Sequence, residues 1–253
     1  ALAATAVLCL TVMLANSVSD AVADEIDHMR EYKVCMALID RTPEEAFEKA
    51  IAWRDLGGGD AARHCAATAL IGLRQFGEAA KRLEALAREI KAGPGFKAEI
   101  LAQAGQALLL GGKPARAAAV LTGALKLSPD DADLLVDRAA ALAAAGRYRE
   151  AVVDLDRAIE RDPTHADAFI FRASAHRFLD DLTRALADAE QGLRLNPGHA
   201  EGLLERGIIH RLNGDDASAR RDWLNLARTA PSTPAAKAAR ANLARMDVKN
   251  TKP

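Results

Sequence analysis

From about residue 98 onward, one pattern of apolar and polar positions returns along the chain. Within residues 132–165, apolar residues recur at helical spacing from Leu134 to Leu142 and again from Ala151 to Ile159. The same small and breaking residues return every 34 positions: Ala117, Ala151, Ala185 and Ala219, and Pro129, Pro163, Pro197 and Pro231. Each 34-residue unit therefore predicts two amphipathic helices joined by a short turn.

The residues between the apolar runs fit this prediction. Gly146 and Gly214 occupy the predicted turn, with Asp180 in the same slot between them. The recurring proline ends the second helix, because it cannot donate a backbone hydrogen bond. An acid follows four residues later, in the first turn of the next helix, where the helix dipole favours negative charge: Asp133, Asp167 and Glu201.

The units resemble the tetratricopeptide repeat (TPR). Residues 132–165 supply the family's large and small residues in order: Leu135, Ala139, Leu142, Ala151, Leu155, Ala158 and Pro163. Residues 98–131, 166–199 and 200–233 match in the same phase. The resemblance implies an all-α fold, a right-handed superhelical solenoid of antiparallel helix pairs, because each unit can bury its apolar face only against a neighbour.

The flanking segments extend the array. Residues 24–97 predict divergent helix pairs, since "RQFGEAAKRLEALA" aligns with "GRYREAVVDLDRAI", and they end in an insertion around Gly93-Pro94-Gly95. Residues 234–253 predict a C-terminal capping helix and tail that begin at Thr233-Pro234.

The first 23 residues differ from the rest. They carry no charge before Asp20, the apolar run Ala6–Ala15 has the length of a signal-peptide core, and Ala21-Val22-Ala23 has the small-x-small pattern of a cleavage site. We therefore expect a signal peptide over residues 1–23 and a periplasmic or secreted protein. The alternative is an uncleaved N-terminal anchor in the inner membrane.

Removal of the leader leaves two cysteines, Cys35 and Cys65, in an oxidising compartment. Each falls on the first helix of its unit, and the first helices of neighbouring units are adjacent in a TPR array. We expect a disulfide between them; two small buried thiols are the alternative.

Charge and motifs narrow the function. The net charge is −1, with 34 basic and 35 acidic residues mixed along the chain, so the basic stripe of a nucleic-acid-binding protein is missing. The sequence has no glycine-rich phosphate loop, G-x-S-x-G or H-E-x-x-H motif. His165 and His199 share one repeat slot, but no Cys or carboxylate stands at ligand spacing. We expect neither enzyme activity nor a metal or cofactor.

The resemblance implies a concave groove lined by the first helix of each pair. Carried over slot by slot, the partner-binding residues are Gln106, Leu109, Val136, Ile170, Ser174, Arg177, Leu204, Ile208 and Arg211. Such a groove is apolar along its middle, acidic on one side and basic near its end, and Ile170, Leu204 and Ile208 are expected to face the open groove. An apolar or amphipathic protein segment fits it. Nucleic acid and small-molecule substrates are not expected, and a membrane is a partner only if the N-terminal segment is retained.

Two functions remain. The first is a non-catalytic scaffold for protein–protein interaction in the periplasm or cell envelope. The second is a membrane-anchored assembly or accessory subunit of an envelope complex. Retention or loss of the N-terminal segment distinguishes them.

We predict cleavage after Ala23, because the small-x-small pattern follows directly on the apolar run. The intact mass of the exported protein should correspond to a chain that begins at Asp24. A mass that still includes residues upstream of Asp20 contradicts cleavage and favours the anchored alternative.

Overall fold

The computed structural model describes residues 27–250, so the predicted signal peptide lies outside the described residues. In this part the chain forms thirteen α-helices and no β-strand. The first helices of the pairs are α1 (His28–Leu38), α3 (Gly59–Gly72), α5 (Pro94–Leu110), α7 (Ala132–Ala144), α9 (Ala166–Phe178) and α11 (Ala200–Leu212). The second helices are α2 (Pro43–Trp53), α4 (Phe76–Glu89), α6 (Pro114–Leu127), α8 (Tyr148–Arg161), α10 (Leu182–Leu195) and α12 (Asp216–Thr229), and α13 (Pro234–Asn250) closes the array.

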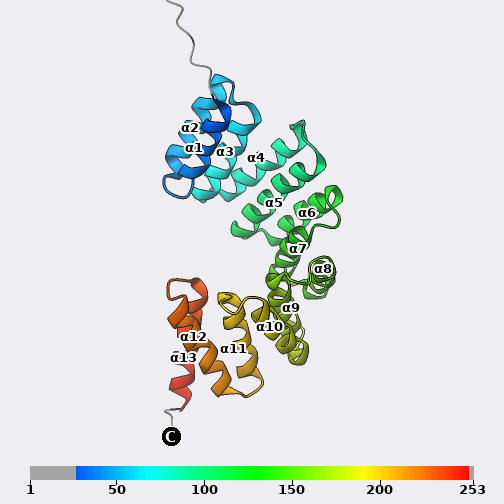
Figure 1. The fold of residues 1–253 in the computed structure, drawn as a ribbon, viewed down its shortest axis with the longest axis vertical. Coiled ribbons are helices and arrows are strands. Elements are labelled where there is room, and N and C mark those ends of the chain that lie inside the picture. Colours follow the sequence, from blue (N-terminus) through cyan, green and yellow to red (C-terminus); the bar gives the residue numbers. More distant parts are fainter. Residues whose placement is uncertain (1–26, 251–253) are drawn as a thin grey trace, which may run out of the picture.

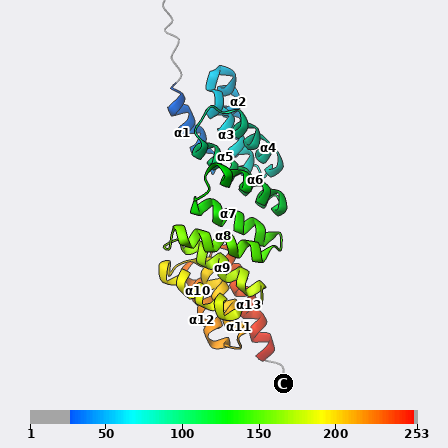
Figure 2. The same cartoon turned by 90° about the vertical axis from the view of Figure 1, so that its right-hand side faces the viewer.

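The helices form one continuous array. Each helix packs against the next along the chain, and first helices also touch first helices of neighbouring pairs, as α7 does with α5 and α9. The array curves so that its two ends lie on the same side (Figure 1), and the pairs stack along one axis (Figure 2). The predicted all-α superhelical solenoid is confirmed.

Small residues set the distance between helices. Ala139, Ala151 and Ala158 are fully buried, and the alanines that recur at the Ala151 slot are fully buried in all four units. A Cβ added at Gly207 would overlap the indole ring of Trp223, so only glycine allows α11 and α12 to approach this closely. Such tight contacts exclude larger side chains from these slots.

The turn slots have the conformation that their residues suggest. Gly146 and Gly214 have φ of 77° and 82°, and Asp180 in the same slot has φ of 63°. Glycine enters this left-handed region freely and aspartate more readily than most residues. The carboxylates of Asp181 and Asp215 then accept backbone hydrogen bonds at the start of α10 and α12.

The predicted insertion around Gly93-Pro94-Gly95 takes the form of a helix extension. Pro94 is the first residue of α5, where a missing N–H costs nothing. Helix α5 therefore begins about one turn earlier than α7, α9 and α11, and this extra turn carries Phe96, which is 45% exposed.

Arginine–aspartate pairs repeat between first and second helices. Arg138 pairs with Asp154, Arg172 with Asp188 and Arg206 with Asp222, each through Nε and Nη2 at 2.6–2.8 Å. The aspartates are buried, and bidentate pairs of this kind are among the stronger hydrogen-bonded contacts. Arg172 also reaches Asp156 of the preceding unit at 2.7 Å. It thus joins three helices: α8, α9 and α10.

The predicted disulfide between Cys35 and Cys65 is present. It joins α1 to α3, with Cα atoms 6.3 Å apart, and both cysteines are fully buried. Cys35 is the one buried residue of α1. The attachment of α1 to the array therefore depends strongly on this covalent bond.

We predict that the Cys35→Ser/Cys65→Ser variant loses about 3–4 kcal/mol of unfolding free energy, because the bond closes a loop of 30 residues in the unfolded chain. Urea unfolding in non-reducing buffer measures the loss. In reducing buffer the wild type should fall to within about 1 kcal/mol of the variant. Equal stability of the two proteins without reductant contradicts the prediction.

Candidate binding surface

The first helices α7, α9 and α11 line a hollow on the face of the array that the TPR resemblance makes concave. This central pocket has a volume of about 400 Å³. Its walls come from these helices and the residues directly before them: Asp133, Val136, Asp137, His165, Asp167, Phe171, His199 and Glu201. The pocket thus combines carboxylates with an aromatic ring, and no Lys or Arg lines it.

The two histidines hold carboxylates of this pocket in place. His199 Nδ1 accepts the backbone N–H of Gly202 at 3.1 Å, so its proton lies on Nε2, which donates to Asp167 Oδ1 at 2.5 Å. His165 Nε2 lies 3.0 Å from Asp133 Oδ1 in the equivalent place. Both histidines are therefore engaged with neighbours. Among residues 27–250, no group of three or more His, Cys, Asp or Glu side chains is placed to hold a metal ion.

Asp137 has the most perturbed carboxyl of the surface. Burial, with the negative charges of Asp133 and Asp131, raises its pKa to about 6, and His165 acts in the opposite direction. Its side chain is nevertheless open to solvent from the groove. The two observations agree because a concave wall removes much of the surrounding water while leaving one side accessible.

The prediction that Ile170 faces the open groove is wrong, whereas Val136 lines the central pocket although little of its surface is exposed. Ile170 is 2% exposed and Val136 is 5% exposed. The Cδ1 atom of Ile170 lies 2.5 Å from where a Cβ would stand at Gly192 and 2.8 Å from the same position at Gly202. The isoleucine side chain occupies the space that the two glycines leave, and Leu193 also lies close to Gly202.

The other predicted groove residues divide into two groups. Gln106 is exposed, and Leu109, Ser174, Leu204 and Ile208 are half-buried, so these five can be reached from solvent. Arg177 and Arg211, predicted at the basic end of the groove, are half-buried and each is paired with a carboxylate within the fold. Arg177 Nε lies 2.5 Å from Glu205, and Arg211 Nη1 lies 3.0 Å from Asp216.

Sequence reasoning missed Asp137 and Phe171. Both stand four residues after an acid of the pocket, Asp133 and Asp167 respectively, and therefore on the same helix face. The predicted set used the residue one position earlier: Val136, which also lines the pocket, and Ile170, which is buried beside Gly192 and Gly202. A spacing of four residues from the first-turn acid would have found them.

A second hollow lies near the N-terminal end of the array. This N-terminal pocket has a volume of about 320 Å³ and is lined by His28, Met29, Tyr32, Asp60, Ala61, His64, Ile90 and Phe96. Its polar atoms are largely paired within the wall. The Tyr32 hydroxyl lies 2.9 Å from His64 Nδ1, and His64 Nε2 lies 2.8 Å from Gln103 Oε1. Burial lowers the pKa of His64, so its ring is neutral near pH 7.

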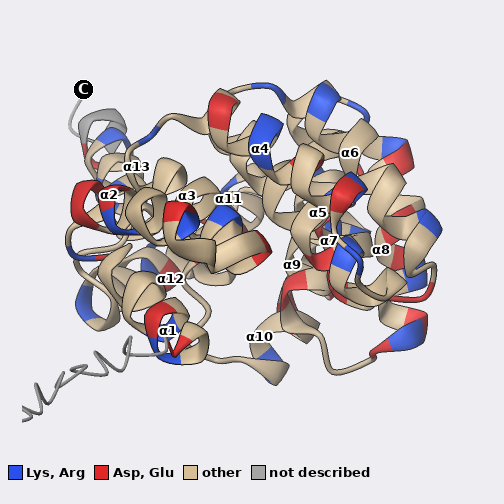
Figure 3. Ribbon diagram, turned by 90° about the horizontal axis from the view of Figure 1, so that it is seen from above, with Lys and Arg blue, Asp and Glu red and all other residues tan. Residues whose placement is uncertain are grey.

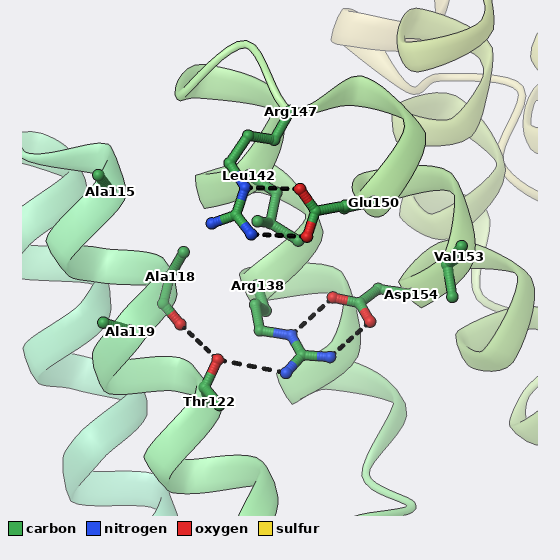
Figure 4. Close-up of a pocket in the computed structure, with 10 residues that line it drawn as sticks. All are labelled: Ala115, Ala118, Ala119, Thr122, Arg138, Leu142, Arg147, Glu150, Val153 and Asp154. Atoms are coloured by element: carbon green, nitrogen blue, oxygen red, sulfur yellow. Dashed lines mark hydrogen bonds and ion pairs between the residues drawn. The ribbon is translucent and has the colours of Figure 1, made fainter.

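A third cavity, of about 410 Å³, lies between α6, α7 and α8 (Figure 4). Arg138 crosses it to Asp154, its Nη1 reaches Thr122 Oγ1 at 3.3 Å, and Arg147 pairs with Glu150 at the rim. These contacts occupy the charged groups of the cavity. Their evident role is to hold the three helices together.

Charge is mixed over the array as a whole, with Lys and Arg interspersed among Asp and Glu and no extended region of one sign (Figure 3). Within residues 27–250, no helix combines the length and apolar character that crossing a membrane requires.

Comparison with protein families agrees with this architecture. Models described as tetratricopeptide repeat match residues 66–132, 108–175 and 172–236. The chain belongs to the tetratricopeptide repeat family. Among curated proteins, none matches this TPR protein.

Solved structures share its fold. PilW, described as a widely conserved type IV pilus biogenesis factor, is 17% identical, with a TM-score of 0.67 over 83% of this chain and 97% of that chain. YrrB, described as a TPR protein with an unusual peptide-binding site, is 21% identical, with a TM-score of 0.54 over 70% and 90%. MamA from Desulfovibrio magneticus RS-1 is 21% identical, with a TM-score of 0.55 over 73% and 97%. At these identities the likeness is one of fold.

The raised pKa of Asp137 predicts a pH-dependent effect on stability. The folded protein binds this proton more tightly than the unfolded chain, whose carboxyl titrates near 3.8. Protonated Asp137 therefore adds to the free energy of unfolding. This contribution is fully present below pH 3.8 and is lost as the pH rises through about 6. Asp137→Asn should therefore be more stable than the wild type at pH 7, and this gain should shrink toward pH 4.

Urea unfolding at the two pH values measures the gain. Asp40→Asn, at an exposed position between α1 and α2, is the matched control and should show no such pH-dependent gain. A gain for Asp137→Asn that is the same at both pH values contradicts the raised pKa.

Proposed function

We propose that this TPR protein is a non-catalytic scaffold that binds a segment of another protein along its concave face. One observation carries the proposal. The first helix α11 leaves the apolar side chains of Leu204 and Ile208 half-exposed, and the same helix contributes Glu201 to the carboxylate-lined central pocket. Side chains of this mixed kind, open to solvent in a hollow, characterise a partner site.

The shape and charge of this face favour a protein segment over other ligands. The carboxylates Asp133, Asp137 and Asp167 repel the phosphates of a nucleic acid. The central pocket is an open hollow along three successive first helices, whereas substrate sites enclose most of a small ligand. YrrB, which shares the fold, is described as having a peptide-binding site, and the same role suits this array.

We further propose that the protein works in the periplasm or outside the cell. The apolar segment before Asp20 and the small-x-small pattern at Ala21-Val22-Ala23 support export. The disulfide between Cys35 and Cys65 suits an oxidising compartment, because such bonds are rare where thiols are kept reduced.

Photo-crosslinking in living cells tests the binding face. A benzophenone amino acid at Gln106 or Ser174, on first helices, should crosslink to a partner protein and give a discrete larger band. The same amino acid at Val153 or Leu224, exposed on second helices at 59% and 52%, should not.

Crosslinks that form equally from both sets contradict a binding site on the concave face. Crosslinks only from Val153 and Leu224 place the partner on the second helices instead.

A further inference from the structure

The N-terminal pocket is an apolar hollow at the surface of the array. Met29 from α1 and Phe96 from the extra turn of α5 stand at the pocket and are 66% and 45% exposed. Ala61 and Ile90 contribute further apolar wall. Large apolar side chains left in water lose the free energy that their burial would provide. This hollow is therefore a place where a partner gains affinity by covering them.

The polar atoms of the pocket do not call for a polar ligand. The Tyr32 hydroxyl, both ring nitrogens of His64 and the Gln103 carbonyl form one hydrogen-bonded chain. The Trp53 indole N–H donates to His28 Nδ1 at 3.0 Å. These groups satisfy one another, and the carboxylate of Asp60 in the pocket wall pairs with Arg63. An apolar group can therefore enter without leaving a buried polar atom unpaired.

The pocket is formed before a partner arrives. Helix α1 supplies one wall, and the disulfide from Cys35 to Cys65 ties α1 to α3, which supplies the opposite wall. A site held by a covalent bond needs little ordering when it binds, and this favours affinity.

The first helices beyond this pocket present negative charge. Glu99 on α5 is exposed and occupies the repeat slot that holds Asp133 on α7, and the central pocket follows with Asp133, Asp137 and Asp167. A segment that lies along the first helices thus meets an apolar hollow at one end and carboxylates at its centre. Basic side chains complement the second part.

We propose that the N-terminal pocket is an anchor site for one large apolar side chain of a partner protein segment whose neighbouring residues are Lys or Arg. The inference rests on the proposed function and specifies the partner's chemistry. A hollow of about 320 Å³ has room for one aromatic or long aliphatic side chain.

Selection from a library of random peptides tests the proposal. Displayed peptides of about 16 residues span about 50 Å when extended, enough to follow several first helices. Selected against the full mature chain, they should be enriched in a large apolar residue accompanied by Lys or Arg. Individual peptides are then measured by fluorescence anisotropy against pocket variants.

Two variants change the pocket, and each has a matched control. Ala61→Trp fills the hollow, and Ala52→Trp places the same side chain at an exposed position of α2. Phe96→Asp puts a charge on the pocket. Its control, Phe178→Asp, puts the same charge at an exposed phenylalanine at the end of α9, outside the pocket. Circular dichroism verifies that each variant is folded.

We expect the selected peptides to bind Ala61→Trp and Phe96→Asp about ten- to a hundred-fold more weakly than the wild type, and the two controls unchanged. Peptides that lack an apolar anchor, or that bind the pocket variants as tightly as the wild type, overturn the anchor site while leaving the scaffold function standing. If no peptide can be selected, the anchor site and the binding of protein segments by the concave face are both wrong.

Discussion

The close approach of neighbouring helices through small side chains is the constraint on which the rest of the structure depends. A fully buried alanine stands near the start of each of the helices α6, α8, α10 and α12. On the first helix α11, Gly207 leaves room for the indole ring of Trp223. This explains how a chain with 4% aromatic residues buries apolar clusters along the length of the array. The narrow interfaces between helices bury apolar surface only between neighbouring units, so the stability of each unit depends on the units beside it.

The same constraint decides where charge can go. The arginine–aspartate pairs at Arg138, Arg172 and Arg206 occupy the space between first and second helices, where long side chains fit around the small ones. Arg177 and Arg211 are also used within the fold. The central part of the concave face is consequently left with carboxylates, which His165 and His199 orient. A nearly neutral chain thereby acquires an acidic central pocket.

Much of the fold could be predicted because its signals are local. The proline period, the turn slot of Gly146, Asp180 and Gly214, and the cysteine pair each specify a backbone conformation or a covalent link. The direction of individual side chains in the groove could not. Whether Ile170 faces solvent or the seam depends on Gly192 and Gly202, which belong to other helices and are 22 and 32 residues away. Periodicity in one helix carries no information about such a partner.

The N-terminal pocket escaped prediction for a similar reason. It combines α1, α3 and the extra turn of α5, whose Pro94 and Gly95 indicate an insertion of unspecified conformation when the sequence is considered alone. Only the assembled array shows that these residues continue a helix and bring Phe96 beside Tyr32 and His64.

The two ends of the array are closed in different ways. At the N-terminal end, α1 is bonded covalently to α3, whereas at the other end α13 is held by non-covalent packing, with Met246 buried against the last units. A linear array opens from its ends, where a terminal unit has a single neighbour to lose. Unfolding from the ends should therefore be one-sided. Helices α13 and α12 separate from the array first, and opening proceeds toward the N-terminal end, where the disulfide keeps α1 attached to α3. The disulfide thus gives the solenoid a polarity that its repeating sequence does not contain.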